Sequence, residues 1–232
     1  MSGLPEPTLE ERASLATAWQ RRGFDSFKYA APIAYSGIVE EMQALRRELG
    51  PHNRIAVDLH WKHSVEDAVQ LINKLEALNP WFVEAPKIPE DTAGLAKIIE
   101  RTNVPIAVGK EWRTVYDMRR CLEFCRIDVV QPKMGHSGIT NFVRMGECAV
   151  EHGIEFIPHA TIGMGLFLAA SVVASSTLTA VAAHECQHSV FDPDRGWIRS
   201  ELACLKGEYV VPSDEGIGAE PSDWTLDMLE RL

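Results

Sequence analysis

The chain alternates short apolar runs with longer amphipathic stretches, and this alternation is regular from residue 24 to residue 186. Most of the apolar runs are rich in Val, Ile and Phe and are continuous, without the polar–apolar alternation of a half-exposed strand. Continuous runs of this kind are typical of strands buried on both faces in a parallel sheet covered by helices. The pattern predicts strands at 24–30, 54–59, 80–85, 104–109, 127–132, 154–158 and 181–186.

Helix start signals precede the amphipathic stretches between these strands. Thr8 is followed three residues later by Glu11, and Ser64 by Asp67, which predicts side-chain capping of the helices that follow. The regular alternation of strand and helix predicts an α/β fold of the (β/α) barrel type at 1–206. A closed barrel of this type has eight strands, whereas seven are visible. Residues 1–7 are too short and too rich in Gly and Pro to supply the first strand, so we expect it to be missing.

A charged or imidazole side chain lies at or near the end of each predicted strand. The steps between these side chains are 30, 26, 26, 23, 26 and 26 residues, about the length of one strand–helix unit. Polar residues at the carboxyl ends of barrel strands are typical of active sites. The sequence therefore predicts a site formed by Lys28, Asp58, Glu84, Lys110, Lys133, His159 and Glu185.

Composition narrows the classes of partner. The formal net charge is −10, from 23 Lys and Arg against 33 Asp and Glu, and no basic run is present. This balance argues against binding to nucleic acid or to an anionic membrane. The uncharged stretch at 162–183 is long enough to cross a bilayer, but its Gly, Ser and Thr residues favour a buried barrel helix. Five cysteines without a CxxC pair are typical of reduced thiols in a cytoplasmic enzyme.

The residue types at the strand ends indicate acid–base chemistry on a carbon acid. Asp58, Glu84 and one further carboxylate would form an all-oxygen site for Mg²⁺, which neutralises an enolate formed next to a carboxylate. His60 lies two residues after Asp58, so both side chains point the same way if the strand continues. Together with His159 it supplies imidazoles suited to proton transfer near neutral pH. Taken singly, a strand-end carboxylate is as often a helix cap or ion-pair partner, and a lone His is more often structural.

Five segments together resemble the barrel domain of the enolase superfamily, and in particular the acid-sugar dehydratases of its mandelate racemase branch. The likeness covers most of residues 1–220. It implies Mg²⁺-dependent removal of water from an aldonate or aldarate, giving a 2-keto-3-deoxy acid. It also implies an amino-terminal capping domain, which we expect to be missing here, and a tail at 207–232 that packs toward it. The segments are VDLHWK (57–62), FVEAP (82–86), VPIAVGKEW (104–112), VVQPKMGHSGIT (129–140) and IPHATIG (157–163).

By this resemblance the metal ligands are Asp58, Glu84 and the residue at the end of the next strand. That position holds Lys110, with Glu111 beside it. A protonated lysine has no lone pair for a metal, so Lys110 would pair with the two carboxylates in the metal's place. Either Glu111 swings in as the third ligand, or metal binding is weakened or lost.

The same resemblance implies that His60 is the base and that His159 delivers a proton to the departing hydroxyl. Lys133 stands where the family usually carries an acid that orients this histidine. A nearby ammonium would disfavour an imidazolium at His159. We expect substrate contacts from Lys28, Lys62, His136 and Glu185, with Arg113 as a further loop residue.

Three hypotheses for function follow. The first is a Mg²⁺-dependent hydro-lyase acting on an acid sugar. The second is Schiff-base chemistry, in which Lys110 or Lys133 attacks a keto-acid carbonyl. The third is a degenerate or truncated barrel without metal or catalysis. For the first, we expect a small-molecule acid sugar as substrate and either a homo-oligomer or a partner chain that supplies the capping domain.

Overall fold

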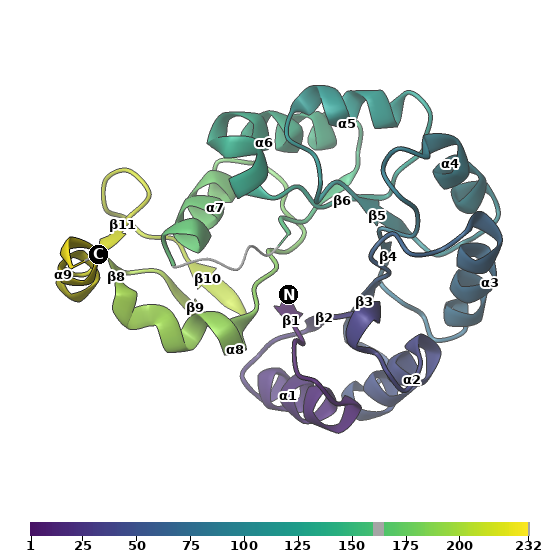
Figure 1. Ribbon diagram of the computed structural model, residues 1–232, viewed down its shortest axis with the longest axis horizontal. Coiled ribbons are helices and arrows are strands. Elements are labelled where there is room, and N and C mark those ends of the chain that lie inside the picture. Colours follow the sequence, from purple (N-terminus) through teal and green to yellow (C-terminus); the bar gives the residue numbers. More distant parts are fainter. Residues whose placement is uncertain (160–164, 232) are drawn as a thin grey trace.

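The computed structural model describes residues 1–159 and 165–231, and its strands form a ring surrounded by helices (Figure 1). The strands are parallel and follow one another in chain order around the ring. This arrangement confirms the predicted (β/α) barrel. Positions 160–163 of the motif at 157–163, and the first residues of the uncharged stretch at 162–183, lie outside the described residues. The strands are β1 (Ser2–Gly3), β2 (Ser26–Ala30), β3 (Arg54–Asp58), β4 (Val83–Glu84), β5 (Ile106–Val108), β6 (Val129–Val130) and β7 (Glu155–Phe156).

The helices lie outside the strands, as burial of the sheet on both faces requires (Figure 1). Thr8 and Glu11 form the predicted capping box on the first helix, and the Ser64 hydroxyl accepts a hydrogen bond from the backbone N–H of Asp67. Both cap predictions are confirmed. The helices are α1 (Leu9–Arg21), η1 (Ala31–Ile33), α2 (Ile38–Leu49), α3 (Val65–Glu76), α4 (Thr92–Glu100), α5 (Val115–Leu122), α6 (Met134–Glu151) and α7 (Leu166–Ser176).

The first strand, which we expected to be missing, is present in shortened form, and this corrects the sequence expectation. In β1, Ser2 pairs with Phe27 and Gly3 with Lys28, parallel to β2. Two residues suffice because the backbone amide of the following residue, Leu4, continues the contact by donating to the Lys28 carbonyl at 2.9 Å. Residues 1–4 thus occupy the place of the first strand.

The segment predicted as the last strand, 181–186, closes the ring between β7 and β1. Glu185 N–H donates to the Pro158 carbonyl at 3.1 Å, and on the other side Gly3 N–H donates to the Cys186 carbonyl at 3.0 Å. Cys186 N–H in turn donates to the Met1 carbonyl at 3.1 Å. The segment is too irregular to form a continuous strand, yet its backbone hydrogen bonds leave no open edge at this point of the barrel.

The barrel interior has an apolar floor. Successive inward positions on a strand are two residues apart, so the next inward residues after the floor lie nearer the carboxyl ends of the strands. These are polar, among them Asp58 after Ala56 and Glu84 after Phe82. The candidate site therefore rests directly on the core of the barrel. The floor is formed by Met1, Ala56, Phe82, Ala107, Val129 and Ile157.

A buried ion pair joins α1 to α2 on the outside of the barrel. Arg12 Nε and Nη2 donate to the two carboxylate oxygens of Glu41 at 2.5 and 2.6 Å, and Nη1 donates to the Glu6 carbonyl at 2.5 Å. Both side chains are almost fully buried. The bidentate geometry satisfies the charges that burial would otherwise leave uncompensated.

The carboxyl-terminal part departs from the repeat and lies beside α7 (Figure 1). The expected boundary between residues 206 and 207 falls in the turn of the antiparallel hairpin formed by β9 (Ala203–Leu205) and β10 (Glu208–Val210). The division into barrel and tail stays a prediction. Among the described helices, none is both long and apolar enough to span a membrane. The elements are α8 (His188–Phe191), η2 (Asp192–Trp197), β8 (Ile198–Ser200), β9 (Ala203–Leu205), β10 (Glu208–Val210), β11 (Ala219–Pro221) and α9 (Asp223–Glu230).

His184, in the segment that closes the barrel, generates a prediction about stability and pH. Its Nδ1 lies 3.0 Å from the Glu185 carbonyl and its Nε2 lies 2.8 Å from the Ser171 hydroxyl, contacts that a neutral imidazole satisfies. Burial lowers the pKa of His184 to about 3, against about 6.5 in an unfolded chain. The contribution of neutral His184 to the free energy of unfolding is therefore fully present above the pKa that this histidine has in the unfolded chain. It is lost as pH falls toward the folded pKa, by at most about 1.4 kcal/mol per pH unit.

We expect His184→Gln to reduce the loss of unfolding free energy between about pH 7 and about pH 5, measured by urea denaturation. The exposed His52 provides the matched control, and His52→Gln should keep the wild-type pH dependence. An unchanged pH dependence in His184→Gln would show that His184 does not carry this effect.

Candidate active site

Asp58 and Glu84 lie side by side at the carboxyl ends of neighbouring strands. Asp58 ends β3, Glu84 ends β4, and the two residues are paired in the register of the sheet. Both side chains are buried, with exposed fractions of 3% and 0%. Two carboxylates in such surroundings repel one another, and burial penalises each charge. Positively charged groups must therefore accompany them.

Lys28 provides the first of these groups. Its Nζ donates to Glu84 Oε2 at 2.5 Å and to Glu185 Oε2 at 2.6 Å. Burial alone would lower the pKa of Lys28, but the charges of Glu185 and Glu84 outweigh it, so that this pKa is raised above its usual value. Lys28 is thus a protonated bridge between Glu84 at the end of β4 and Glu185 in the segment that closes the barrel.

Lys110 provides the second positive group. Its Nζ forms a short hydrogen-bonded ion pair with Asp58 Oδ2 and lies 3.3 Å from Glu84 Oε1. The Nζ also lies 4.4 Å from the centre of a Trp61 ring, a distance at which the ring face attracts a cation. The side chain of Lys110 is 4% exposed. Its ammonium therefore occupies the space between the two carboxylates.

The two histidines expected to transfer protons each contact a different carboxylate. His60 Nδ1 lies 3.0 Å from Asp58 Oδ2, and the His60 backbone N–H donates to Asp58 Oδ1 at 2.9 Å. His159 Nε2 lies 3.3 Å from Glu84 Oε1. The imidazole of His60 is 38% exposed and that of His159 is 13% exposed. Both are close enough to the carboxylate pair to act on the same small molecule.

The environment keeps both carboxylates ionised. Burial raises the pKa of Glu84, but Lys28, His159 and Lys110 together hold it well below the usual range. For Asp58, burial and the neighbouring Glu84 raise the pKa, while the hydrogen bond from His60 and the charges of both lysines lower it overall. The site is therefore a buried network of ion pairs at neutral pH.

Glu111 does not lie with the other expected metal ligands. The described side chains that could share one ion at this site are Asp58, Glu84 and His159, whose donor atoms lie within 4.8 Å of one another. Glu111 instead lines a hollow of about 480 Å³ next to α4 and α5, together with Leu95. Burial raises the pKa of Glu111.

The remaining expected residues lie toward the loops. Lys133 precedes α6 and is half-buried, and burial together with the charge of Lys110 lowers its pKa. Within the described residues, no hydrogen bond or ion pair is made by its ammonium. His136 Nδ1 lies 3.1 Å from the Lys110 carbonyl, and burial and Lys133 lower its pKa. Lys62 and Arg113 are exposed.

Three features of the site were missed from the sequence. His60, Trp61 and Ala85 have positive φ values of 52°, 61° and 49°, a conformation that non-glycine residues rarely adopt outside constrained sites. A hydrogen bond from Trp61 N–H to the Ala85 carbonyl at 2.9 Å holds the two loops together. Gln131 is fully buried, and its side-chain amide has no partner among the described residues. Only the position of these residues just beyond strand ends could have indicated them.

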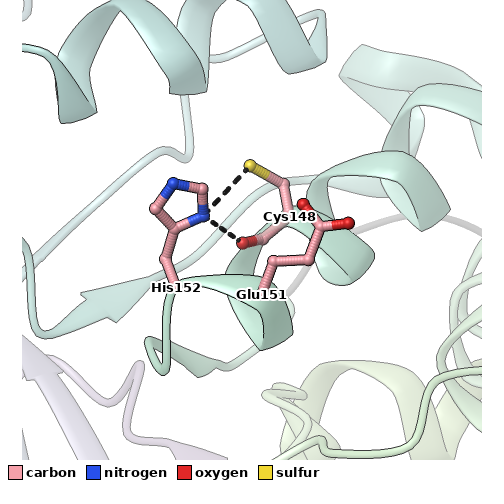
Figure 2. Close-up of side chains that lie close together, drawn as sticks. All are labelled: Cys148, Glu151 and His152. Atoms are coloured by element: carbon pink, nitrogen blue, oxygen red, sulfur yellow. Dashed lines mark hydrogen bonds between the residues drawn. The ribbon is translucent and has the colours of Figure 1, made fainter.

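A second group of metal-ligating side chains lies on the outer helix layer. Cys148, Glu151 and His152 come from the last turns of α6, and His152 Nδ1 lies 2.8 Å from the Cys148 carbonyl and 3.8 Å from its Sγ (Figure 2). The contact with the carbonyl engages this ring nitrogen as a hydrogen-bond donor. We interpret the group as a side-chain contact that satisfies a helix end.

Comparison with known proteins identifies the family. The family described as "Enolase C-terminal domain-like" matches residues 10–225. The chain belongs to this family. The match confirms the resemblance inferred from the five motifs.

Two curated relatives and one solved structure extend the comparison. The chain is 22% identical over 223 residues to D-galactarolactone cycloisomerase of Agrobacterium fabrum, covering 91% of this chain and 58% of the relative. It is 29% identical over 157 residues to D-galactonate dehydratase of Ralstonia pickettii, covering 63% and 41%. A member of the enolase superfamily from Agrobacterium tumefaciens superposes with a TM-score of 0.94 at 53% identity, covering 97% of this chain and 58% of that one. The chain therefore spans less than two thirds of each of these proteins.

The bridge made by Lys28 generates a prediction about stability. Lys28→Met leaves Glu84 and Glu185 buried with less compensation, so we expect the free energy of unfolding to fall by about 3–5 kcal/mol at neutral pH. Urea denaturation measures this loss. The double variant Lys28→Met/Glu185→Gln should recover part of it, because one of the two stranded charges is gone. Lys74→Met, at an exposed position of α3, should stay within about 0.5 kcal/mol of wild type.

Proposed function

We propose that the barrel mouth abstracts a proton next to the carboxylate of an acid sugar and expels the 3-hydroxyl, giving a 2-keto-3-deoxy acid. The observation that carries this proposal is the placement of two imidazoles, at 3.0 and 3.3 Å, on two adjacent buried carboxylates. The names of the two curated relatives, a dehydratase of galactonate and a cycloisomerase of galactarolactone, support the same class of substrate. The enzyme class is a carbon–oxygen lyase.

His60 acts as the base in this proposal. Asp58 Oδ2 lies 3.0 Å from Nδ1, and its negative charge favours a proton on that nitrogen, so that Nε2 keeps the lone pair that accepts the substrate proton. The greater exposure of this ring allows a substrate carbon to approach it. The hydrogen bond to the backbone of His60 holds the residue in its unusual conformation and fixes the direction of the ring.

His159 acts as the acid that protonates the departing hydroxyl. Its contact with Glu84 holds the ring at the edge of the buried network, and its partial exposure leaves it accessible to substrate. Because His60 and His159 contact different carboxylates, one can gain a proton while the other loses one. Elimination of water requires this division of roles.

Local cations must hold the anionic substrate, because the chain as a whole carries a net charge of −10. We assign this role to Lys62, Lys133 and His136. Lys28 and Glu185 form a buried ion pair in the site, and we assign them to contact with the substrate. The side-chain amide of Gln131 is fully buried and has no partner among the described residues, so we assign it to an ordered water.

The residues present do not fit a Mg²⁺ ion. Asp58 and Glu84 are engaged by Lys110, and Glu111 lies in a different hollow. Mg²⁺ requires near-octahedral oxygen ligands, whereas the third side chain in reach is the imidazole of His159. No step of the proposed reaction therefore passes through a metal.

Two observations support the presence of a further domain or a partner chain. The relatives are longer than this chain, and an apolar surface is exposed. Helix α9 exposes Trp224, Met228 and Leu229 by 51%, 46% and 56%. Such a surface is typical of a site covered by protein. We propose that a capping domain, on this or a partner chain, or a second copy of the chain packs near the tail. The five free cysteines support a cytoplasmic location.

Hydrogen–deuterium exchange tests proton abstraction directly. The chain is incubated in D₂O with a panel of aldonates and aldarates, and NMR follows deuterium at the carbon next to the carboxylate together with keto-acid formation. We expect turnover of at least one acid sugar. His60→Asn should lower exchange and product formation by about 10²–10⁴-fold. His159→Asn should lower product formation by a similar factor while exchange persists.

The control for this assay is His52→Asn, which lies at an exposed position away from the strand ends and should keep the wild-type rate. Absence of both exchange and product across the whole panel would contradict the proposal. That result would favour the degenerate or truncated barrel.

A second candidate function, Schiff-base chemistry, is favoured by the lowered pKa of Lys133. Its neutral amine would add to a keto-acid carbonyl and release water to form an imine. Borohydride reduction in the presence of pyruvate should then add mass at Lys133 and not in Lys133→Arg. Lys110 should remain unmodified, since its ammonium is held by two carboxylates. An unmodified mass at both lysines would exclude this function.

A further inference from the structure

The space between Asp58 and Glu84 has the donor set of a cation site. Two carboxylates on neighbouring strands converge there, and both are buried. Such a pair requires a positive charge between its members, because ionisation of both without one is strongly unfavourable. The residues around Asp58 and Glu84 determine which cation this position holds.

The surroundings suit an ammonium. Lys110 Nζ contacts an oxygen of each carboxylate, and the ring of Trp61 covers it at 4.4 Å. A carboxylate and an aromatic face both attract an ammonium, and the face does so through its quadrupole. An indole face offers no oxygen to Mg²⁺, which binds ligand atoms at about 2.0–2.1 Å in an octahedron.

Three of the four carboxylate oxygens accept hydrogen bonds, whereas Glu84 Oε1 is buried and accepts none from the described residues. Asp58 Oδ1 accepts the His60 backbone N–H, and Asp58 Oδ2 is bound by Lys110. Glu84 Oε2 accepts from Lys28 at 2.5 Å, and Glu84 Oε1 lies 3.3 Å from both Lys110 Nζ and His159 Nε2. A metal would have to break several of these contacts and would then lie next to two buried ammonium groups.

We propose that the Lys110 ammonium is the resident cation of this site, so that the barrel mouth excludes divalent metal and binds its anionic substrate without one. The catalytic part of this inference rests on the proposed function, whereas the exclusion of metal does not. In the reaction, Lys110 and Lys28 supply fixed positive charge beneath the substrate carboxylate, where negative charge develops after proton removal.

Titration with Mg²⁺ alone tests the exclusion. The chain is treated with EDTA, dialysed and titrated with MgCl₂ in a calorimeter, and its melting temperature is followed in parallel. We expect no saturable heat and no rise in melting temperature for the wild type. Lys110→Glu provides a third carboxylate beside the pair and should bind Mg²⁺ at least about 10-fold more tightly, with a Mg²⁺-dependent rise in melting temperature.

Lys110→Met is the second variant, in case Lys110→Glu does not fold. It removes the ammonium without adding a charge, so Mg²⁺ should raise its melting temperature by filling the vacated position. Lys74→Glu makes the same charge reversal at an exposed site and should gain no binding. Saturable Mg²⁺ binding by the wild type that is lost in Asp58→Asn would overturn the inference, and this measurement needs no variant of Lys110.

The exchange assay in EDTA separates this inference from the proposed function. Proton exchange that persists in EDTA supports both. Exchange that requires Mg²⁺ overturns the inference and leaves the proposed function standing. Absence of exchange together with absence of Mg²⁺ binding overturns the proposed function, while the exclusion of metal stands.

Discussion

The structure of the site depends on the compensation of buried carboxylates by buried lysines. Asp58, Glu84 and Glu185 lie inside the barrel, where an uncompensated charge costs several kcal/mol. Lys28 and Lys110 balance two of these three charges and join residues from strands that are distant in the chain. Loss of either lysine would leave like charges facing one another in a medium of low dielectric. The network therefore constrains both the closure of the barrel and the chemistry at its mouth.

The barrel makes this network possible because its interior is layered. The apolar floor around Phe82 and Ile157 excludes water from below, and the alternation of side chains along each strand places polar groups above it. Short strands such as β4 and β6 still position their side chains well, since hydrogen bonds on both sides fix the backbone. The same layering leaves the two histidines at the upper edge of the network, where their rings are partly exposed. Rigid support from below and access from above are what the proposed proton transfer to a small molecule requires.

Several parts of the site were predictable because they depend on spacing alone. The strand-to-strand interval placed Asp58, Glu84 and His159 at one end of the barrel, and the family match confirms the fold that this interval implies. Residue chemistry also indicated that Lys110 could not ligate a metal. Other parts depend on contacts between distant segments. The position of Glu111 and the cover that Trp61 forms over Lys110 follow from loop conformations that no periodicity reports. The same holds for the buried amide of Gln131, which has no partner among the described residues.

The sequence by itself determined the alternation of strands and helices, the face at which the polar residues gather, and the family, because these follow from periodicity and local motifs. Only the tertiary structure decided that residues 1–4 occupy the place of the first strand, since two residues gain a strand's hydrogen bonds solely from neighbours already in position. It likewise decided which oxygen each lysine binds. That choice depends on the orientations of side chains from five separate segments. Because these side chains are buried, no water can replace a missing hydrogen-bond partner, so each orientation affects stability.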